Sequence, residues 1–94
     1  MAAYWIAHIV VTDETAYAAY ARQATEIITA HGGTFLARGG RHRQFERRDR
    51  ARNVLAEFPT FEAAEACYLS DAYQGIVDIA TGASERDLVI VEGP

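Results

Sequence analysis

Apolar residues gather in four short segments of the chain, and glycine, proline or capping residues separate these segments. The first strand is predicted at Tyr4–Val11, where aromatic and β-branched residues are interrupted only by His8. Three more strands are predicted at Thr34–Arg38, at Arg52–Phe58 and at Asp87–Val91. The pattern therefore predicts four strands joined by connections of unequal length.

Apolar residues recur with helical spacing between some of these strands. A long helix is predicted over residues 14–31, with Thr12 or Asp13 as its N-cap. A second helix is predicted over Phe61–Leu69, and a further turn or helix over Ala72–Ala80. The apolar face of the long helix consists of Tyr17, Tyr20, Ala24, Ile27 and Ile28.

The predicted order of elements is β-α-β-β-α-β, which is typical of the ferredoxin-like split βαβ sandwich. Right-handed crossovers then give a four-stranded antiparallel sheet in the order 4-1-3-2, with the helices on one face. We expect residues 1–94 to form a single domain of this α+β class. Since helices cover only one face, the other face must meet water, a partner or a ligand.

The open face of the predicted sheet lacks the polar side chains of a solvated surface. Alternation along the first strand gives one face with Tyr4, Ile6, His8 and Val10 and the other with Trp5, Ala7, Ile9 and Val11. A chain of this size buries only about 60–65% of its unfolded surface, so association would add stability. We therefore expect a homodimer formed through the open sheet face.

The charges of the chain are distributed unevenly. The formal net charge is −4, yet residues 38–52 hold seven arginines against Glu46 and Asp49. Residues 41–51, the arginine-rich arm, are predicted to form a long hairpin arm, with or without a short pair of strands around residues 44–46. The arm has one aromatic residue and no nucleic-acid-binding motif, so we expect a solvated loop that pairs with acidic patches of the partner subunit, and no nucleic-acid binding.

Compartment and metal content are predicted from a few residues. The single cysteine, Cys67, cannot form an internal disulfide, which fits a cytoplasmic protein with a buried core thiol. The longest apolar run, residues 5–11, is too short to span a membrane, and no basic region of a signal peptide precedes it. The three histidines are too widely spaced for a metal-binding motif, so neither a metal nor another cofactor is expected.

Several motifs along the chain are familiar in combination. They include Tyr4-Trp5-Ile6-Ala7, Leu36-Ala37-Arg38-Gly39-Gly40, Glu57-Phe58-Pro59-Thr60-Phe61-Glu62-Ala63-Ala64 and Asp87-Leu88-Val89-Ile90-Val91. With them, nearly the whole chain resembles the domain of unknown function family 1330. The resemblance implies a dimeric α/β barrel, in which two ferredoxin-like protomers pack their open sheet faces together around a cavity. That superfamily includes cofactor-independent monooxygenases, small isomerases, lactone-forming enzymes and haem-dependent enzymes.

A polar set is predicted on the cavity face of such a barrel. Alternation along the strands gives Tyr4, His8, Arg38, Asn53 and Glu57. Arg38 would hold an anionic group, Glu57 or His8 would act as the catalytic acid or base, and Asn53 and Tyr4 would contact the ligand. The alternative is an interface ion pair between Arg38 and Glu57, with His8 making hydrogen bonds that have only a structural role. By analogy with the fold, Tyr73 would lie on a helix that covers the cavity, with its hydroxyl toward the ligand.

Two functions follow from these expectations. The first is a cofactor-independent enzyme that acts on a small anionic or carbonyl-bearing organic molecule in the barrel cavity. The alternative is a non-catalytic dimer that binds a small molecule or has a structural role. A ligand-sized cavity lined by the polar set would support the enzyme, and a cavity filled by apolar side chains would support the alternative.

Overall fold

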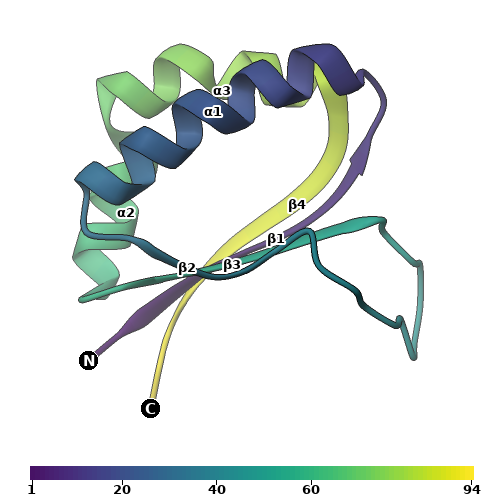
Figure 1. Cartoon of the computed structure of the whole chain (residues 1–94). Coiled ribbons are helices and arrows are strands. Elements are labelled where there is room, and N and C mark those ends of the chain that lie inside the picture. Colours follow the sequence, from purple (N-terminus) through teal and green to yellow (C-terminus); the bar gives the residue numbers. More distant parts are fainter.

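The computed structural model describes residues 1–94, and its elements run in the order β-α-β-β-α-α-β (Figure 1). The strands are β1 (Ala3–Val11), β2 (Thr34–Arg38), β3 (Arg52–Phe58) and β4 (Ser84–Glu92). The helices are α1 (Glu14–Ala30), α2 (Phe61–Leu69) and α3 (Asp71–Ala83).

The four strands form one antiparallel sheet in the order β2-β3-β1-β4. The helices lie on one side of this sheet and leave its other face uncovered, as Figure 1 shows. We call these the helix-covered face and the open face. The prediction of a ferredoxin-like sandwich with the strand order 4-1-3-2 is therefore confirmed.

The core lies between the helices and the sheet, and Trp5 of β1 is at its centre. The Trp5 side chain is only 2% exposed. Its ring centroid lies 5.9 Å from that of Phe58 on β3 and 5.2 Å from that of Tyr73 on α3. The aromatic contacts join two strands and a helix, which holds α3 over the middle of the sheet.

The helices begin at polar caps, and one of these caps divides the second helical region in two. The side chains of Asp13 and Thr60 accept hydrogen bonds from the backbone of α1 and α2. Ser70 ends α2 and also caps α3, where its hydroxyl accepts from the backbone N–H of Tyr73 at 3.1 Å. The helix predicted to end at Ala80 continues to Ala83, and β4 starts directly after it at Ser84. The last strand is therefore longer at its start than the sequence predicted.

A β-bulge in β2 changes the face on which Arg38 lies. The register between β2 and β3 shifts between Phe35 and Ala37, so that Ala37 is opposite Leu55 and Arg38 is opposite Val54. Val54 packs against the buried core, and Arg38 therefore belongs to the helix-covered face. The prediction that Arg38 shares the open face with Glu57 is wrong, because simple alternation does not allow for the extra residue of a bulge.

The arginine-rich arm is an irregular loop without the short strand pair considered from the sequence. It extends beyond the sheet between β2 and β3 (Figure 1). Its return is fastened to β4 of the same chain, since Arg48 bonds Glu85 at 3.0 Å and Arg50 bonds Asp87. The arm thus finds acidic partners within its own protomer. No helix of the molecule is long and apolar enough to cross a membrane.

Candidate functional site

A cleft separates α1 from the helix-covered face of β2 and β3. Its outer part has a volume of about 590 Å³, and a narrow inner part of about 40 Å³ continues toward Trp5. Tyr17, Thr25, Arg38 and Arg52 line both parts, so the two form one continuous space. The cleft is present in a single protomer and does not need a partner to enclose it.

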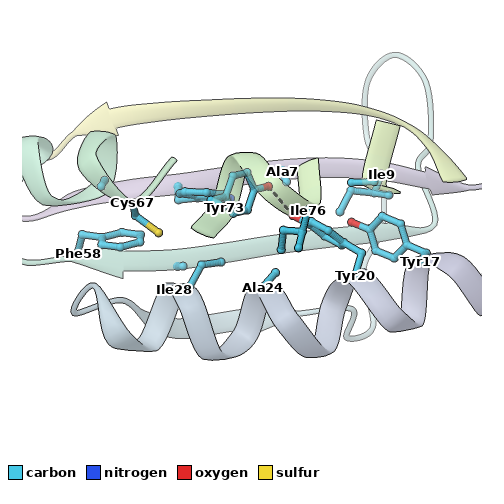
Figure 2. Close-up of a cluster of buried hydrophobic side chains, with 14 of the residues drawn as sticks. Ala7, Ile9, Tyr17, Tyr20, Ala24, Ile28, Phe58, Cys67, Tyr73 and Ile76 are labelled. Atoms are coloured by element: carbon cyan, nitrogen blue, oxygen red, sulfur yellow. Dashed lines mark hydrogen bonds between the residues drawn. The ribbon is translucent and has the colours of Figure 1, made fainter. Parts of the chain in front are cut away.

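A buried cluster of two tyrosines and one arginine lies beside the inner part of the cleft. Nη1 of Arg86, on β4, donates to the hydroxyl of Tyr20 at 2.9 Å, and Nη2 donates to the hydroxyl of Tyr73 at 2.8 Å. The two hydroxyls also bond each other, as the dashed line in Figure 2 shows. Three separate elements, α1, α3 and β4, therefore meet at these polar atoms.

No carboxylate neutralises Arg86. The ion pairs of the chain involve His42, Arg48 and Arg50, and the only partners of the Arg86 side chain are the neutral hydroxyls. Partial burial of a guanidinium without a counterion is costly, and a bound anionic group would offset part of that cost. The cluster therefore concentrates positive charge where the cleft is narrowest.

The two tyrosines of the cluster stay protonated at neutral pH. Burial raises the pKa of both the Tyr20 and Tyr73 hydroxyls, and the nearby Arg86 lowers it only in part. One hydroxyl hydrogen is used in the bond between the tyrosines. The other hydroxyl hydrogen and the remaining N–H groups of Arg86 have no partner in the protein. Tyr20 and Arg86 line the inner part of the cleft, so their donors lie next to a ligand oxygen bound there.

Arg38 lies at the outer part of the same cleft. Its Nη1 donates to the hydroxyl of Thr25 on α1 at 2.9 Å, and its guanidinium lies 4.4 Å from the ring centroid of Phe35. Tyr73 is fully buried within the core and does not cover the open face, so its predicted position as a lid over that face is wrong. Arg38 and Tyr73 therefore lie near a cleft on the helix-covered side of the sheet, whereas the predicted cavity was on the open side.

The other four predicted site residues are on the open face, as alternation indicated, but they form two separate pairs. Tyr4 is opposite Glu57 in the sheet, and His8 is opposite Asn53, with His8 Nδ1 2.6 Å from Asn53 Oδ1. Four residues along a strand span about 13 Å, which separates the two pairs. Within one protomer, Glu57 and His8 therefore do not share a site, and neither lies beside Arg38.

The sequence reasoning missed Arg86 and the role of the tyrosine hydroxyls. The strand was predicted to start at Asp87, which left Arg86 outside it. Leu88 and Ile90 face the helices, and extending their alternation by one step would have placed Arg86 on the same face. The signal was present in the pattern but lay beyond the predicted end of the strand.

Cys67 and the acidic residues offer no further reactive centre. Burial raises the pKa of the Cys67 thiol to about 11, so it is protonated at neutral pH and is a poor nucleophile. No three His, Cys, Asp or Glu side chains come together in a geometry that could hold a metal ion. The chemistry of the cleft therefore rests on arginine and tyrosine.

Solved structures with this fold have sequences that differ greatly from this one. A protein of unknown function from Rhodopseudomonas palustris is 16% identical, with a TM-score of 0.82 over 99% of this chain and 82% of that chain. SnoaB, a cofactor-independent oxygenase from Streptomyces nogalater, is 8% identical, with a TM-score of 0.72 over 99% of this chain and 93% of that chain. A dimeric ferredoxin-like protein of unknown function from a Jannaschia species is 15% identical, with a TM-score of 0.66 over 99% of this chain and 100% of that chain.

At these identities the likeness concerns the fold. No curated protein matches the chain. The sequence motifs, however, are matched by a family model that extends over residues 2–94. The chain therefore belongs to the family described as a domain of unknown function (DUF1330), as its motifs predicted.

Proposed function

We propose that this protein is a cofactor-independent enzyme that acts on a small carbonyl-bearing organic molecule bound between α1 and the sheet. The observation that carries the proposal is the cluster of Arg86, Tyr20 and Tyr73. It combines a partly buried cation that has no counterion with a hydroxyl hydrogen that has no acceptor. Such a cluster resembles the preorganised donors that stabilise a developing oxyanion.

The reaction that suits these donors is transfer of a proton from the carbon next to a carbonyl group to a base, which in this cleft would be Glu14, the one carboxylate of its lining, or a solvent hydroxide ion. Negative charge then moves onto the carbonyl oxygen, where Arg86 and one tyrosine hydroxyl donate hydrogen bonds to it. The fixed positions of the three side chains on different elements mean that little reorganisation accompanies the charge movement. SnoaB, which shares the fold, is described as a cofactor-independent oxygenase, and this supports a chemistry that uses protein groups alone.

The source of the base separates this proposal from a second candidate function. The inner cleft contains no carboxylate or imidazole, and Glu14 is the one carboxylate of the outer lining. Glu57 and His8 remain proposed acids or bases only for a ligand held at the open face. The lack of a base in the inner part of the cleft is the observation that favours the alternative, a protein that binds a small carbonyl-bearing molecule without converting it.

We also propose that two protomers associate through their open faces. Val89 and Val91 of the edge strand β4 are 53% and 45% exposed, on the face of the sheet that no helix covers. The Jannaschia protein of similar fold is described as dimeric. In such a dimer Tyr4, His8, Asn53 and Glu57 would face the partner's sheet, where Glu57 and His8 would take part in interface hydrogen bonds or act on a ligand enclosed there.

Hydrogen–deuterium exchange at carbon distinguishes the enzyme from the binding protein. Small ketones and 1,3-diketones are incubated with the protein in deuterated buffer, and exchange at the carbon next to the carbonyl is followed by NMR. We expect the wild-type protein to accelerate exchange of at least one compound, and Arg86→Gln to lower that rate roughly 10²–10³-fold. Arg43→Gln, in the exposed arm, is the matched control and should keep the wild-type rate.

Binding without any acceleration of exchange would support the second candidate in place of the enzyme. Tyr73→Phe removes one hydroxyl while keeping the ring that packs on Trp5. We expect this variant to bind the same compound with reduced affinity. If exchange is accelerated equally by the wild-type protein and Arg86→Gln, the cluster has no catalytic role.

A further inference from the structure

We infer that the outer part of the cleft is an anion subsite built on Arg52, with Arg38 beside it, for a carboxylate or phosphate group of the ligand. This inference rests on the proposed function to the extent that both place the ligand in the cleft between α1 and the sheet. It adds the chemical class of the ligand. The molecule would be an organic acid or phosphate ester whose carbonyl or phenolic oxygen lies several bonds from its anionic group.

The first argument is that the guanidinium of Arg52 has no partner of its own. Its Nε is buried and bonds no acceptor, and no hydrogen bond or ion pair of the chain involves the side chain. Arg48 and Arg50, by contrast, reach carboxylates of β4. The Nη groups of Arg52 also lack a partner in the protein, and an oxyanion bound in the cleft would pair with them.

The second argument is that the protein holds this guanidinium in a fixed place. Gly39 has a φ of +68°, and a Cβ atom there would lie 2.7 Å from Nη1 of Arg52. On another side the guanidinium lies 5.9 Å from the ring centroid of Tyr17. The turn after β2 and the start of α1 therefore confine Arg52, and a preorganised arginine loses less entropy when it binds an oxyanion.

The third argument is the charge around it. Arg22, Arg38 and Arg52 line the outer cleft, and Glu14 is the only acidic residue among the lining residues. This local excess of positive charge occurs in a chain whose net charge is −4. A cluster of arginines that is not balanced by the surrounding protein attracts anionic ligands.

The fourth argument is the position of Arg52 relative to Arg86. Both residues are opposite Ile9 in the sheet, one on β3 and the other on β4, so they flank it on the same face. Two strand spacings separate their backbones by about 10 Å. Burial raises the pKa of the intervening Tyr17, and both arginines lower it, as expected if both lie near its hydroxyl. A ligand that spans this distance would place one oxygen at each arginine.

Titration with simple anions tests the subsite. Trp5, the only tryptophan, lines the inner and not the outer part of the cleft, so binding is followed by isothermal titration calorimetry in place of fluorescence. The probes are benzoate and inorganic phosphate, which present a planar and a tetrahedral oxyanion. We expect saturable binding of at least one probe, competition by chloride, and an affinity about tenfold weaker in Arg52→Gln. Benzoate alone would indicate a carboxylate ligand, and phosphate alone a phosphate ester.

Matched variants keep the result interpretable. Arg41→Gln, in the exposed arm, should bind as the wild type does, and Arg52→Lys should bind with intermediate affinity because it keeps the charge and loses the fork. If Arg52→Gln does not fold, Arg38→Gln takes its place and should also weaken binding. Binding that is the same in Arg52→Gln and the wild type, or no binding of either probe to the wild type, would show that Arg52 only supports the turn at Gly39.

The outcome is independent of the test of catalysis. Binding of a monoanion should change little in Arg86→Gln, whereas deuterium exchange should be lost in that variant. Anion binding that depends on Arg52, without any exchange, would retain the subsite and reject the enzyme. Exchange that needs Arg86, with anion affinity unaffected by Arg52→Gln, would retain the enzyme and reject the subsite.

Discussion

The two faces of the sheet use the same strands but different kinds of side chain. On the helix-covered face, Trp5, Ala7 and Ile9 of β1 are all at most 2% exposed, and three arginines lie at the end of the sheet where β1 leads into α1. On the open face, the middle is apolar and partly exposed, and the polar residues occupy the two ends. The helix-covered face therefore combines a buried apolar core with arginines at one end, and the open face has an apolar patch that no helix covers.

This difference indicates that the two faces of the sheet have different functions. A partly buried arginine without a counterion is costly, and a bound ligand would offset that cost, so Arg86 and Arg52 point to a binding function for the helix-covered face. An exposed apolar patch such as that around Val89 is best explained by a second protein surface. Binding of a small molecule and association of protomers would then use opposite sides of four strands.

The largest contrast is expected between two neighbouring residues of β1. Trp5→Ala should lower the free energy of unfolding by about 3–5 kcal/mol, because it leaves a cavity among the aromatic rings of the core. Ile6→Ala, on the open face, should cost less than half as much. Both substitutions are made in a Val89→Asp background, which we expect to be monomeric, and denaturant unfolding of the two variants gives the comparison. Equal losses would mean that the two faces are equally well packed.

The next largest effect concerns association. Val89→Asp places a charge on the open face beside Ile6, and we expect the dissociation constant of the dimer to rise roughly a hundredfold, or about 3 kcal/mol. Ile79→Asp, on the outer surface of α3, is the control. Sedimentation at micromolar concentration is the measurement. A wild-type protein that sediments as a monomer, or a Val89→Asp variant that stays dimeric, would contradict association through this face.

Alkaline pH should weaken the helix-covered face in particular. Burial raises the pKa of Tyr17, Tyr20 and Tyr73 above the ordinary value of 10.0. Above about pH 10 the unfolded chain loses these protons while the folded chain keeps them, so stability is fully present below that pH and falls above it. The slope is up to about 1.4 kcal/mol per pH unit for each group.

Tyr20→Phe removes one of these groups. The variant should start less stable, because Arg86 and Tyr73 lose a partner, but its stability should fall less steeply with pH. Denaturant unfolding between about pH 8 and pH 11 measures both slopes. If they are parallel, the Tyr20 hydroxyl is not shielded from water as the structure requires.

The smallest expected effect lies at Gly39. Gly39→Ala forces a side chain into a left-handed backbone conformation and against the guanidinium of Arg52, which should cost about 1–2 kcal/mol of stability. Anion affinity should fall with it, because Arg52 must move. Gly40→Ala is the control, since a Cβ atom there meets nothing within 4 Å. Stability and benzoate affinity that are unchanged in Gly39→Ala would mean that the turn does not confine Arg52.

The two faces of the central strands could be predicted from the sequence, and the site could not. Alternation assigned the faces of β1 and β3 correctly, because both strands are regular along their whole length. It failed for Arg38, since a bulge in β2 has no clear signature in a stretch as short as residues 34–38. Local patterns describe one element at a time, so they do not reveal an insertion that is fixed by the neighbouring strand.

The cluster around Arg86 depends on contacts between distant parts of the chain. Tyr20 was predicted to be in the core, as it is, but its partners lie 53 and 66 residues away in the sequence. Tyr73 was placed over the open face by analogy with the fold, and the cap at Ser70 instead turns its ring into the core. Which polar atoms meet inside a core follows from how helices pack, and that information is not in the spacing of apolar residues.

The central claim is that ligands bind on the helix-covered face. An NMR titration of the isotopically labelled protein with benzoate tests it most directly, because each backbone amide reports on its own surroundings. We expect the largest shift changes at Tyr17, Thr25, Gly39 and Arg52, and none beyond the spread of the other amides at His8, Asn53 and Glu57. Changes confined to His8, Asn53 and Glu57 would place the ligand at the open face and contradict the account.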